Sequence, residues 1–197
     1  MSEVWVKIYL PDIICWFFVR LLLFYRRIRY GFTFRKIPLT QGQFAIVDDD
    51  DFEKLSRYKW LVTKNRRTFY ASRTVRLKDG SHKKVNIQMH RKVLNAPDGA
   101  IVDHINHNGL DNRKANLRLV TAGQNCWNAR KRYGCTSKYK GVSWNKSARK
   151  WQARIAYKRK WTFIGYFDDE LSAAKAYDVK ARELFGDFAY LNFPDEK

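Results

Sequence analysis

The chain has few cysteines. Of its 197 residues only Cys15, Cys126 and Cys135 are cysteine, and none of them forms a CxxC pair. An odd number of widely spaced cysteines argues against a disulfide framework and favours a reducing, intracellular setting. A zinc site drawn from His104, His107, Cys126 and Cys135 would lack the paired ligand spacing of structural zinc sites, so it has little support.

Acidic residues are also scarce. The chain has 39 Lys and Arg against 19 Asp and Glu, a formal charge of +20 and a pI near 10.0. Residues 113–167 contain fifteen Lys or Arg and no Asp or Glu. A surface that is merely well solvated would mix both signs to limit self-repulsion. The charge therefore indicates a nucleic-acid partner.

A long apolar run is missing as well. Residues 13–25 are strongly apolar and are followed by arginines, but Arg20 in their middle costs about 2.5 to 3.5 kcal/mol in a bilayer. Pro11 and Asp12 interrupt any extension of the run, and no small-residue cleavage site follows it. We therefore predict neither a membrane span nor a signal peptide, and treat residues 1–35 as an extension of unknown role. A membrane-tethered form stays open.

With 45% apolar residues, the chain can build two compact domains. Residues 44–47 and 60–63 read as strands, and an acidic run before Phe52 starts a helical turn. Residues 68–77 alternate in polarity, Asp79-Gly80 supplies a hairpin turn, and residues 85–89 alternate back. These features predict an antiparallel β lead-in. Its basic edge either touches a duplex or is simply solvated; the edge comprises Arg66, Arg67, Arg73, Arg76, Lys83 and Lys84.

Residues 103–125 read DHINHNGLDNRKANLRLVTAGQN. The carboxylate of Asp103 and the amide of Asn125 offer oxygen ligands of the kind that Mg²⁺ prefers. His104 has an ordinary pKa of about 6.5, suited to taking a proton from water near neutrality. A strand leads into this pair, a second strand is expected at 117–120, and Thr121 is the expected N-cap of a following helix. A metal and a base together provide what phosphodiester hydrolysis needs.

The string resembles the HNH endonucleases of the ββα-metal class, in the form whose last His is replaced by Asn. The resemblance covers residues 36–129. It implies that Asp103 and Asn125 bind a divalent cation, Mg²⁺ or Mn²⁺, that His104 is the general base, and that Asn116 holds the loop and orients His104. The remaining polar residues of this region, Asn106, Asn108, Asn112, His107 and His90, are expected to form turns or to pack, with a phosphate contact as an alternative for His90.

Residues 139–193 contain YKGVSW, RKWQARI, IGYFDDELSAAKAYD and LNFP. They resemble the plant ethylene-response-factor (APETALA-type) DNA-binding domain, which is also found fused to phage and homing nucleases. Strands are expected at 141–145, 151–157 and 162–167, followed by a helix at 171–185. Residues at helical spacing are expected to face the sheet, namely Leu171, Ala174, Tyr177, Ala181 and Leu184.

The middle strand of this domain has two faces. Trp151, Ala153, Ile155 and Tyr157 share one, and Gln152, Arg154, Ala156 and Lys158 share the other, which is the candidate DNA-reading face. Expected DNA contacts are Lys140, Ser143, Asn145, Lys146, Arg149, Gln152, Arg154, Lys158, Lys160 and Trp161. Trp144 and Trp161 either stack on DNA or join the core, and Trp151 is expected in the core. Several positions that hold Arg in the plant domain are Ser143, Asn145, Ala156 and Trp161 here, so no plant site preference is transferred.

The sequence thus predicts an α+β chain. A ββα-metal HNH module at 36–130 follows the β lead-in, a linker spans 131–138, and a three-stranded antiparallel sheet packs on one helix at 139–194. The expected function is a metal-dependent DNA endonuclease of the homing or phage type, targeted by its C-terminal domain. We expect double-stranded DNA as the partner, no small-molecule substrate, a monomer, and an intracellular location in a host cell. The alternative is a regulatory DNA-binding protein with an inactive nuclease module.

Overall fold

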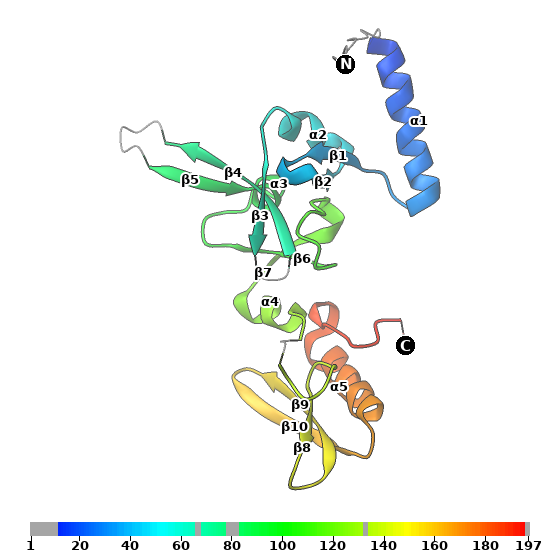
Figure 1. Ribbon diagram of the computed structural model, residues 1–197, viewed down its shortest axis with the longest axis vertical. Coiled ribbons are helices and arrows are strands. Elements are labelled where there is room, and N and C mark those ends of the chain that lie inside the picture. The colour runs from blue at the N-terminus through cyan, green and yellow to red at the C-terminus, as the bar shows by residue number, and fades with distance from the viewer. Residues whose placement is uncertain (1–11, 66–67, 78–82, 132–133, 196–197) are drawn as a thin grey trace, which may run out of the picture. The chain divides into compact units, whose positions relative to one another are not determined.

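A computed structural model of the chain describes residues 12–65, 68–77, 83–131 and 134–195. It is a mixed α+β structure of small antiparallel sheets and helices, and it separates after Leu119 into two compact units (Figure 1). The predicted fold class is confirmed.

The first unit begins with helix α1, Asp12–Tyr30. Within this helix only Leu23 is buried, and most of its large apolar side chains are exposed. Its last turns are tied to the following segment, because the Arg26 guanidinium donates to the Phe34 carbonyl and lies 4.4 Å from the centre of the Phe34 ring. No helix in the described ranges combines the length and apolar character required to cross a bilayer.

Two short strands follow the helix. Strand β1, Arg35–Pro38, pairs antiparallel with β2, Phe44–Val47, across a one-turn 3-10 helix at Thr40–Gly42. Helix α2, Asp49–Ser56, follows the N-cap residue Asp48 and has three aspartates in its first turn, where negative charge interacts favourably with the helix dipole. The predicted strand at 44–47 and the helical turn at Phe52 are confirmed.

The β lead-in is a three-stranded antiparallel sheet in the order β3-β4-β5. Its strands are β3 (Leu61–Asn65), β4 (Thr68–Arg76) and β5 (Lys84–Gln88), with Leu61 opposite Ser72 and Val75 opposite Val85. The predicted Asp79-Gly80 turn lies outside the described residues. Helix α3, Met89–Val93, follows β5 directly, so the alternating pattern predicted to reach Met89 ends one residue earlier.

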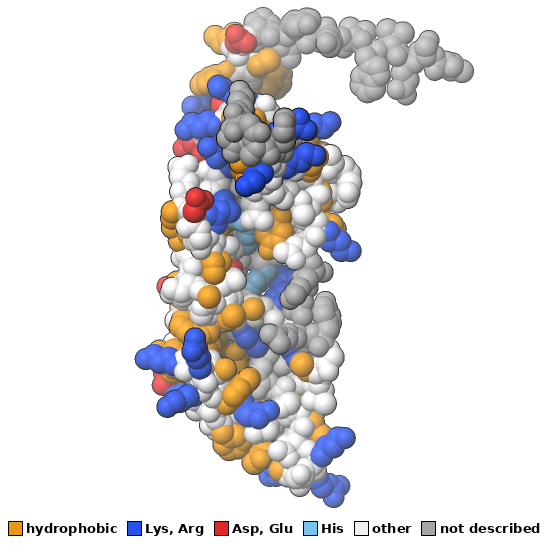
Figure 2. Space-filling view, turned by 90° about the vertical axis from the view of Figure 1, so that its left-hand side faces the viewer, with side chains coloured by type: hydrophobic (Ala, Val, Ile, Leu, Met, Phe, Trp, Pro, Cys, Tyr) orange, Lys and Arg blue, Asp and Glu red, His pale blue; other side chains and the backbone are white. Residues whose placement is uncertain are grey.

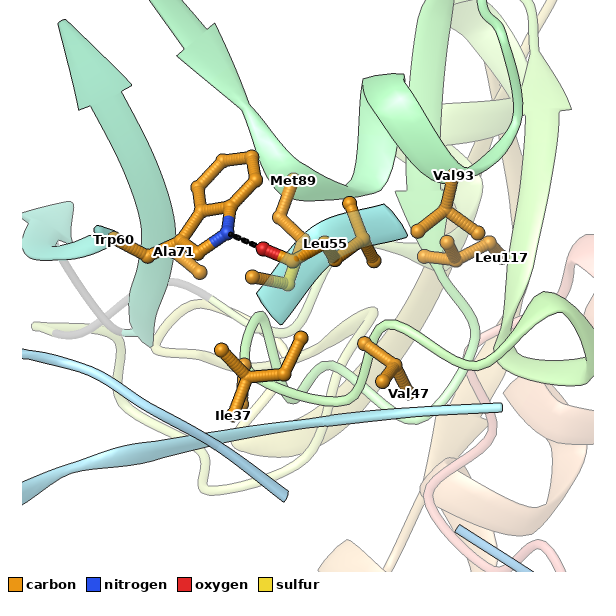
Figure 3. Packing of buried hydrophobic residues seen from close by; sticks show 9 residues of the cluster. Ile37, Val47, Leu55, Trp60, Ala71, Met89, Val93 and Leu117 are labelled. Atoms are coloured by element: carbon orange, nitrogen blue, oxygen red, sulfur yellow. Dashed lines mark hydrogen bonds between the residues drawn. The ribbon is translucent and has the colours of Figure 1, made fainter. Parts of the chain in front are cut away.

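One hydrophobic cluster joins these elements to the next strand pair (Figure 3). It contains Ile37, Ala45, Val47, Leu55, Trp60, Ala71, Met89, Val93 and Leu117. The largest member, Trp60, is 1% exposed, and its indole nitrogen donates to the Leu55 carbonyl at 2.9 Å, which satisfies its only polar atom. Because Leu117 lies in this cluster, the core fixes the strand that borders the HNH-like loop.

That strand pair consists of β6, Ile101–His104, and β7, Leu117–Val120. A 3-10 turn at Lys114–Asn116 leads into β7. Helix α4, Ala122–Asn128, follows, and Thr121 caps it. The Thr121 hydroxyl accepts from the backbone nitrogen of Gln124 at 3.2 Å, and the side-chain oxygen of Gln124 accepts from the backbone nitrogen of Thr121 at 2.9 Å. Two strands followed by a helix were predicted for this part of the chain, with Thr121 as the N-cap of the helix. Both predictions are confirmed.

The second unit contains a sheet in the order β10-β9-β8 and helix α5. Its elements are β8 (Val142–Asn145), β9 (Lys150–Tyr157), β10 (Lys160–Phe167), α5 (Glu170–Phe185) and a 3-10 turn at Gly186–Phe188. These bounds agree with the predicted strands and helix to within two residues. Gly141 precedes β8 at φ +78°, and a Cβ there would lie 1.9 Å from the Tyr177 ring, so only glycine fits.

One predicted packing residue of α5 is wrong. Leu171 is 45% exposed, whereas Ala173 and Phe185 are buried with the predicted Ala174, Tyr177 and Ala181. The buried positions 173, 177, 181 and 185 follow a spacing of four, and Leu171 lies at the edge of this stripe.

Helix α4 groups with the second unit. The Trp127 ring stacks on Phe185, with centroids 4.7 Å apart and planes at 8°, and the Trp127 carbonyl accepts from the Tyr190 nitrogen at 3.2 Å. The HNH-like motif therefore extends across the division between the units, while the domain bounds expected from the sequence stay predictions.

Candidate functional site

Asp103 and His104 end strand β6, and both side chains are buried. Arg118, on the neighbouring strand β7, donates from Nε to Asp103 Oδ2 at 3.0 Å, and its second nitrogen lies 3.0 Å from the same oxygen. Through these contacts the guanidinium offsets the charge of the buried carboxylate.

His104 lies in a cluster of three rings. Its ring centroid is 5.6 Å from that of Tyr70 on β4 and 5.0 Å from that of His90 on α3. Burial lowers the pKa of the His104 imidazole, whereas the side chain of Asn112 and the carboxylates of Asp103 and Asp111 act to raise it. Burial also lowers the pKa of His90, to about 3, with help from His104 and Arg91. Both imidazoles are therefore neutral at neutral pH, and His104 is able to accept a proton.

Asn116 connects both ends of the loop between β6 and β7. Its side-chain oxygen accepts from the Asn106 nitrogen at 2.9 Å, its side-chain nitrogen donates to the Asp111 carbonyl at 2.8 Å, and its carbonyl accepts from the Ile105 nitrogen at 2.9 Å. These contacts are of the kind expected of a residue that holds the loop beside His104.

The loop itself is built from side chain to backbone contacts. The side-chain oxygens of Asn106 and Asn108 each accept from the nitrogen two residues ahead, at 2.9 Å and 3.1 Å, which confirms their prediction as turn formers. His107 has a φ of 61° and donates its backbone nitrogen to the His104 carbonyl, as a turn residue does. Asn112 differs, because it is fully buried, and its backbone nitrogen donates to Ile46 on β2.

Gly109 allows the loop to approach strand β4. A Cβ at this position would lie 2.4 Å from the Phe69 carbonyl oxygen and 2.7 Å from the Tyr70 ring. The Gly109 nitrogen also donates to the Thr68 hydroxyl at 3.1 Å. The loop thus helps to hold the Tyr70 ring next to the two histidines.

Sequence reasoning gave no role to Asp111, Arg118 or Tyr70. Asp111 is 2% exposed, pairs with Arg113 at 2.7 Å and accepts from the Asn106 side chain at 2.8 Å. One signal was present, because Asp111 is the only acidic residue between Asp103 and Asp168. Tyr70 gave no such signal, since only the fold brings it beside His104.

Asn125 lies on α4, in the second unit. Its side chain is exposed, and its backbone nitrogen donates to the Thr121 carbonyl at 3.0 Å inside the helix. Within the ranges that the structure describes, no three His, Cys, Asp or Glu side chains are arranged to hold a metal ion. A carboxylate and an amide oxygen remain a chemically suitable pair for Mg²⁺ or Mn²⁺.

Comparison with known proteins addresses the same residues. A family profile described as HNH endonuclease matches residues 95–126. An uncharacterised HNH endonuclease of Acanthamoeba polyphaga mimivirus is 32% identical over 158 residues, which are 77% of this chain and 76% of that protein. This chain belongs to the HNH endonuclease family.

Two shorter similarities accompany this match. Protein 3.8 of Escherichia phage T7 is 34% identical over 93 residues, 47% of this chain and 76% of that protein. An AP2-like ethylene-responsive transcription factor of Arabidopsis thaliana is 36% identical over 63 residues, 32% of this chain but only 14% of that protein. The HNH assignment therefore rests on the family profile and the mimivirus protein, and the plant similarity is partial.

The second unit of this HNH chain has the two-faced sheet expected from the sequence. Ala153 and Ile155 are buried against α5, while Arg154 is exposed on the opposite face. The register places Phe163 opposite Arg154 and Trp161 opposite Ala156, so exposed aromatic side chains share the Arg154 face. We refer to this side of the sheet as the outer face.

The candidate DNA contacts lie in different environments. Trp161 is 72% exposed, and the Arg154 guanidinium lies 5.6 Å from its ring centre. Asn145 is engaged locally, with the Ala148 nitrogen at 2.9 Å and the Tyr166 hydroxyl at 3.3 Å. Ser143 and Gln152 pair across β8 and β9 on the outer face and are half-buried, and the remaining basic candidates are exposed: Lys146, Arg149, Lys158 and Lys160.

Lys140 differs from the other basic candidates. Its ammonium group donates to the carbonyls of Trp127 and Ala129 at 2.5 Å and 2.8 Å, at the C-terminal end of α4. Burial lowers its pKa to about 8. Its hydrogen bonds therefore hold α4 within the second unit.

Trp151 is half-buried and packs against the cluster of Val142, Ala153, Ala173 and Ala174, as expected of a core residue. Trp144 packs edge-on against it, with centroids 5.2 Å apart, and is partly exposed. Of the two tryptophans with open roles, Trp161 is the one on the outer face.

Proposed function

We propose that this chain is a divalent-metal-dependent DNA endonuclease in which His104 is the general base. The observation that supports this most directly is the environment of His104. Its neutral imidazole lies at the end of β6, directly after the buried carboxylate of Asp103. The loop that follows is held by hydrogen bonds from the side chain of Asn116. In this role His104 removes a proton from the water that attacks the phosphorus atom, a contribution of about 10² to 10⁴ in rate.

Asp103 and Asn125 are the proposed metal ligands. Their donor atoms are hard oxygens, of the kind that Mg²⁺ prefers. When bound, a divalent cation would neutralise charge on the phosphoryl oxygens and assist the departing alkoxide. Asn116 would act indirectly, because its hydrogen bonds are to the loop.

The proposed substrate is double-stranded DNA. Lys and Arg side chains are spread over the face drawn in Figure 2, while acidic side chains on it are few. The outer face of the second unit carries the exposed side chains of Arg154 and Trp161, with lysines nearby. Basic side chains can bind phosphate, and an exposed aromatic ring can stack on a base. We propose that the second unit positions the nuclease on its target.

A plasmid assay tests the proposed activity. Purified protein is incubated with supercoiled plasmid with and without Mg²⁺, and conversion to nicked and linear forms is followed. We expect cleavage only with the metal, and we expect His104→Ala to lose at least a hundredfold in rate while still binding DNA. The matched control is His107→Ala, three residues along the same loop. Equal rates for His104→Ala and the wild type would refute the assignment.

The second candidate function is DNA binding by a chain with an inactive nuclease. It is favoured by the partial similarity to a plant transcription factor. The same assay separates the two, because this candidate predicts duplex binding without metal-dependent cleavage under any condition.

A further inference from the structure

Helix α1 carries a row of exposed apolar side chains along one side. Phe17, Leu21, Phe24 and Ile28 recur at spacings of four, three and four, which makes them neighbours on the helix surface. Each of the four is more than half exposed. Contiguous apolar surface of this kind on a folded protein typically marks an interaction site. We refer to these four residues as the apolar stripe.

The other side of α1 attaches the helix to the first unit. Leu23 is the single buried residue of the helix, at 7% exposure. Arg26, three residues later, donates to the Phe34 carbonyl, and its guanidinium lies over the Phe34 ring. Because these contacts lie on the side of the helix away from the apolar stripe, the stripe is accessible to an external partner.

Positive charge borders the apolar stripe. Arg20 and Arg27 each lie three residues after a phenylalanine of the stripe, a spacing that makes them its neighbours on the helix surface. Arg29 directly follows the last stripe residue, and all three arginines are exposed. Asp12, in the first turn, is the only acidic residue of α1. A partner that covers the stripe therefore meets a basic border.

Aromatic residues with a polar atom lie beside two of these arginines. Trp16 is 58% exposed, and the Arg20 guanidinium lies 5.2 Å from its ring centre. Tyr30 is 52% exposed, and the Arg29 guanidinium lies 5.7 Å from its ring centre. Tryptophan, tyrosine and arginine side chains are suited to the boundary between lipid acyl chains and headgroups, because each has an apolar body and a polar end.

Two occupants suit the apolar stripe, a second copy of this chain and a lipid surface. In a dimer through α1, each helix would bring three exposed arginines and one aspartate to the contact, so like charges would oppose association. An anionic lipid surface supplies both an apolar layer and negative charge. Arg20 near the middle of the helix favours a position in the plane of that surface over a crossing.

We propose that α1 binds an anionic lipid surface. The apolar stripe enters the boundary of the acyl chains, and Arg20, Arg27 and Arg29 bind the phosphates of the headgroups. The helix lies parallel to the surface, and its contacts through Leu23 and Arg26 hold the first unit beside the lipid. This binding is independent of the nuclease activity proposed above.

Vesicle binding of the full chain tests the proposal. The vesicles contain either phosphatidylcholine alone or equal parts of phosphatidylcholine and phosphatidylglycerol, and bound protein is separated by flotation. We expect binding to the anionic vesicles, and we expect replacement of the four stripe residues by Gln to weaken it by at least about a hundredfold. Replacement of Arg20, Arg27 and Arg29 by Gln should weaken it about fivefold for each arginine.

Two controls separate this binding from the general attraction of a basic chain to anionic vesicles. The stripe variant has the net charge of the wild type, so binding by charge alone would leave its affinity unchanged. A variant with Lys146, Arg149, Lys158 and Lys160 replaced by Gln loses four positive charges outside α1. We expect it to lose less affinity than the variant without the three arginines, although it loses more charge.

Tryptophan fluorescence reports whether the stripe itself enters the lipid, and it does not require the stripe variant to fold. Phe24→Trp places a probe in the stripe, and Val179→Trp places one at an exposed position of α5 as the control. In anionic vesicles that contain brominated phosphatidylcholine, we expect the added emission of Phe24→Trp to be quenched and that of Val179→Trp to be unchanged.

Four results would overturn the proposal. The wild type could fail to bind anionic vesicles, the folded stripe variant could bind them as tightly as the wild type, or quenching could be equal at the two probe positions. A dimer that forms without lipid and that the stripe substitutions dissociate would assign the stripe to a second copy of the chain instead.

Discussion

The ion pair between Asp103 and Arg118 is both a stability feature and a probe of metal binding. Both side chains are largely buried, so removing one partner leaves an uncompensated charge in the interior. We expect Arg118→Met to lower the free energy of unfolding by about 3 kcal/mol in metal-free buffer. Millimolar Mg²⁺ should restore part of this loss, because a cation at Asp103 would replace the missing positive charge.

Thermal or urea unfolding with and without Mg²⁺ measures both effects. The double variant Asp103→Asn with Arg118→Met is the control, since it removes both charges and should be less destabilised than the sum of the single variants. A magnesium effect of equal size in the double variant would show that the cation acts elsewhere.

The buried histidines predict a loss of stability in acid. The pKa of His90 is lowered to about 3 in the folded protein, against an ordinary 6.5, so the unfolded chain binds more protons between these values. The stabilising effect of the neutral imidazole is fully present above pH 6.5 and is lost as the pH falls toward 3, by about 1.4 kcal/mol per pH unit. The charged or titratable groups around it are His104 on β6, Tyr70 on β4 and Arg91 on its own helix.

Urea unfolding at pH 7, 5 and 4 tests this dependence. His90→Phe cannot bind the proton and should lose less stability than the wild type over this range. The variant should still show the part of the acid-induced loss of stability that comes from His104, because the pKa of His104 is also lowered. Parallel pH profiles for the two proteins would contradict the assignment.

At this scale the sequence could predict only those site residues that lie close together in the motif. Asp103, His104 and Asn116 follow from the HNH-like string, because residue type and spacing together specify them. His90 and Tyr70 come from other elements, and alternation along β4 does not reveal that one of its residues faces a histidine. Their place beside His104 depends on the packing of α3 and β4 next to β6.

At the scale of single elements, local patterns predicted most helices and strands. Strand β9 alternates so that Ala153 and Ile155 are buried and Arg154 is exposed, as its sequence indicates. Helix α5 was predicted within one residue, but Leu171 was assigned to its buried face because a spacing of three and a spacing of four both fit a helix. Packing on the sheet, which the sequence does not describe, selects between them.

Helix α1 presents an apolar stripe that the rest of the described structure leaves uncovered. Phe17, Leu21, Phe24 and Ile28 recur at spacings of four, three and four, and each is more than half exposed, whereas Leu23 is buried. We expect replacement of these four residues by Gln to reduce binding of an apolar fluorescent dye while changing the free energy of unfolding by about 0.5 kcal/mol or less.

Leu23→Ala is the matched control. This substitution in the same helix should lower the free energy of unfolding by about 2 kcal/mol and leave dye binding unchanged. If the fourfold variant proved less stable than Leu23→Ala, the stripe would have to be part of the fold.

At the scale of the whole molecule, the length of the chain allows the two compact units into which it separates, but the place of α4 was not accessible from the sequence. Its first five residues lie within the matched HNH segment, yet Trp127, directly after that segment, stacks on Phe185, and the Trp127 carbonyl accepts from Lys140. These contacts depend on aromatic residues nearly sixty positions apart. A truncation after residue 133 would remove Phe185, Lys140 and Tyr190, which all contact Trp127, so substitutions in the full chain are the sharper test of targeting.

If the second unit positions the nuclease, removing its exposed positive charges should weaken DNA binding without slowing the chemistry. A variant with Lys146, Arg149, Lys158 and Lys160 replaced by Gln keeps Lys140, whose ammonium is engaged within the fold. Each lost phosphate contact should reduce the slope of log affinity against log salt by about 0.9. The rate at saturating DNA should not change, because none of these residues belongs to the β6–β7 loop. Binding titrations at several salt concentrations measure the slope, and Lys175→Gln with Lys180→Gln on α5 is the control for loss of positive charge from another part of the same unit. An unchanged slope in the fourfold variant, or an equal change in the control, would remove the targeting role from this face of the sheet.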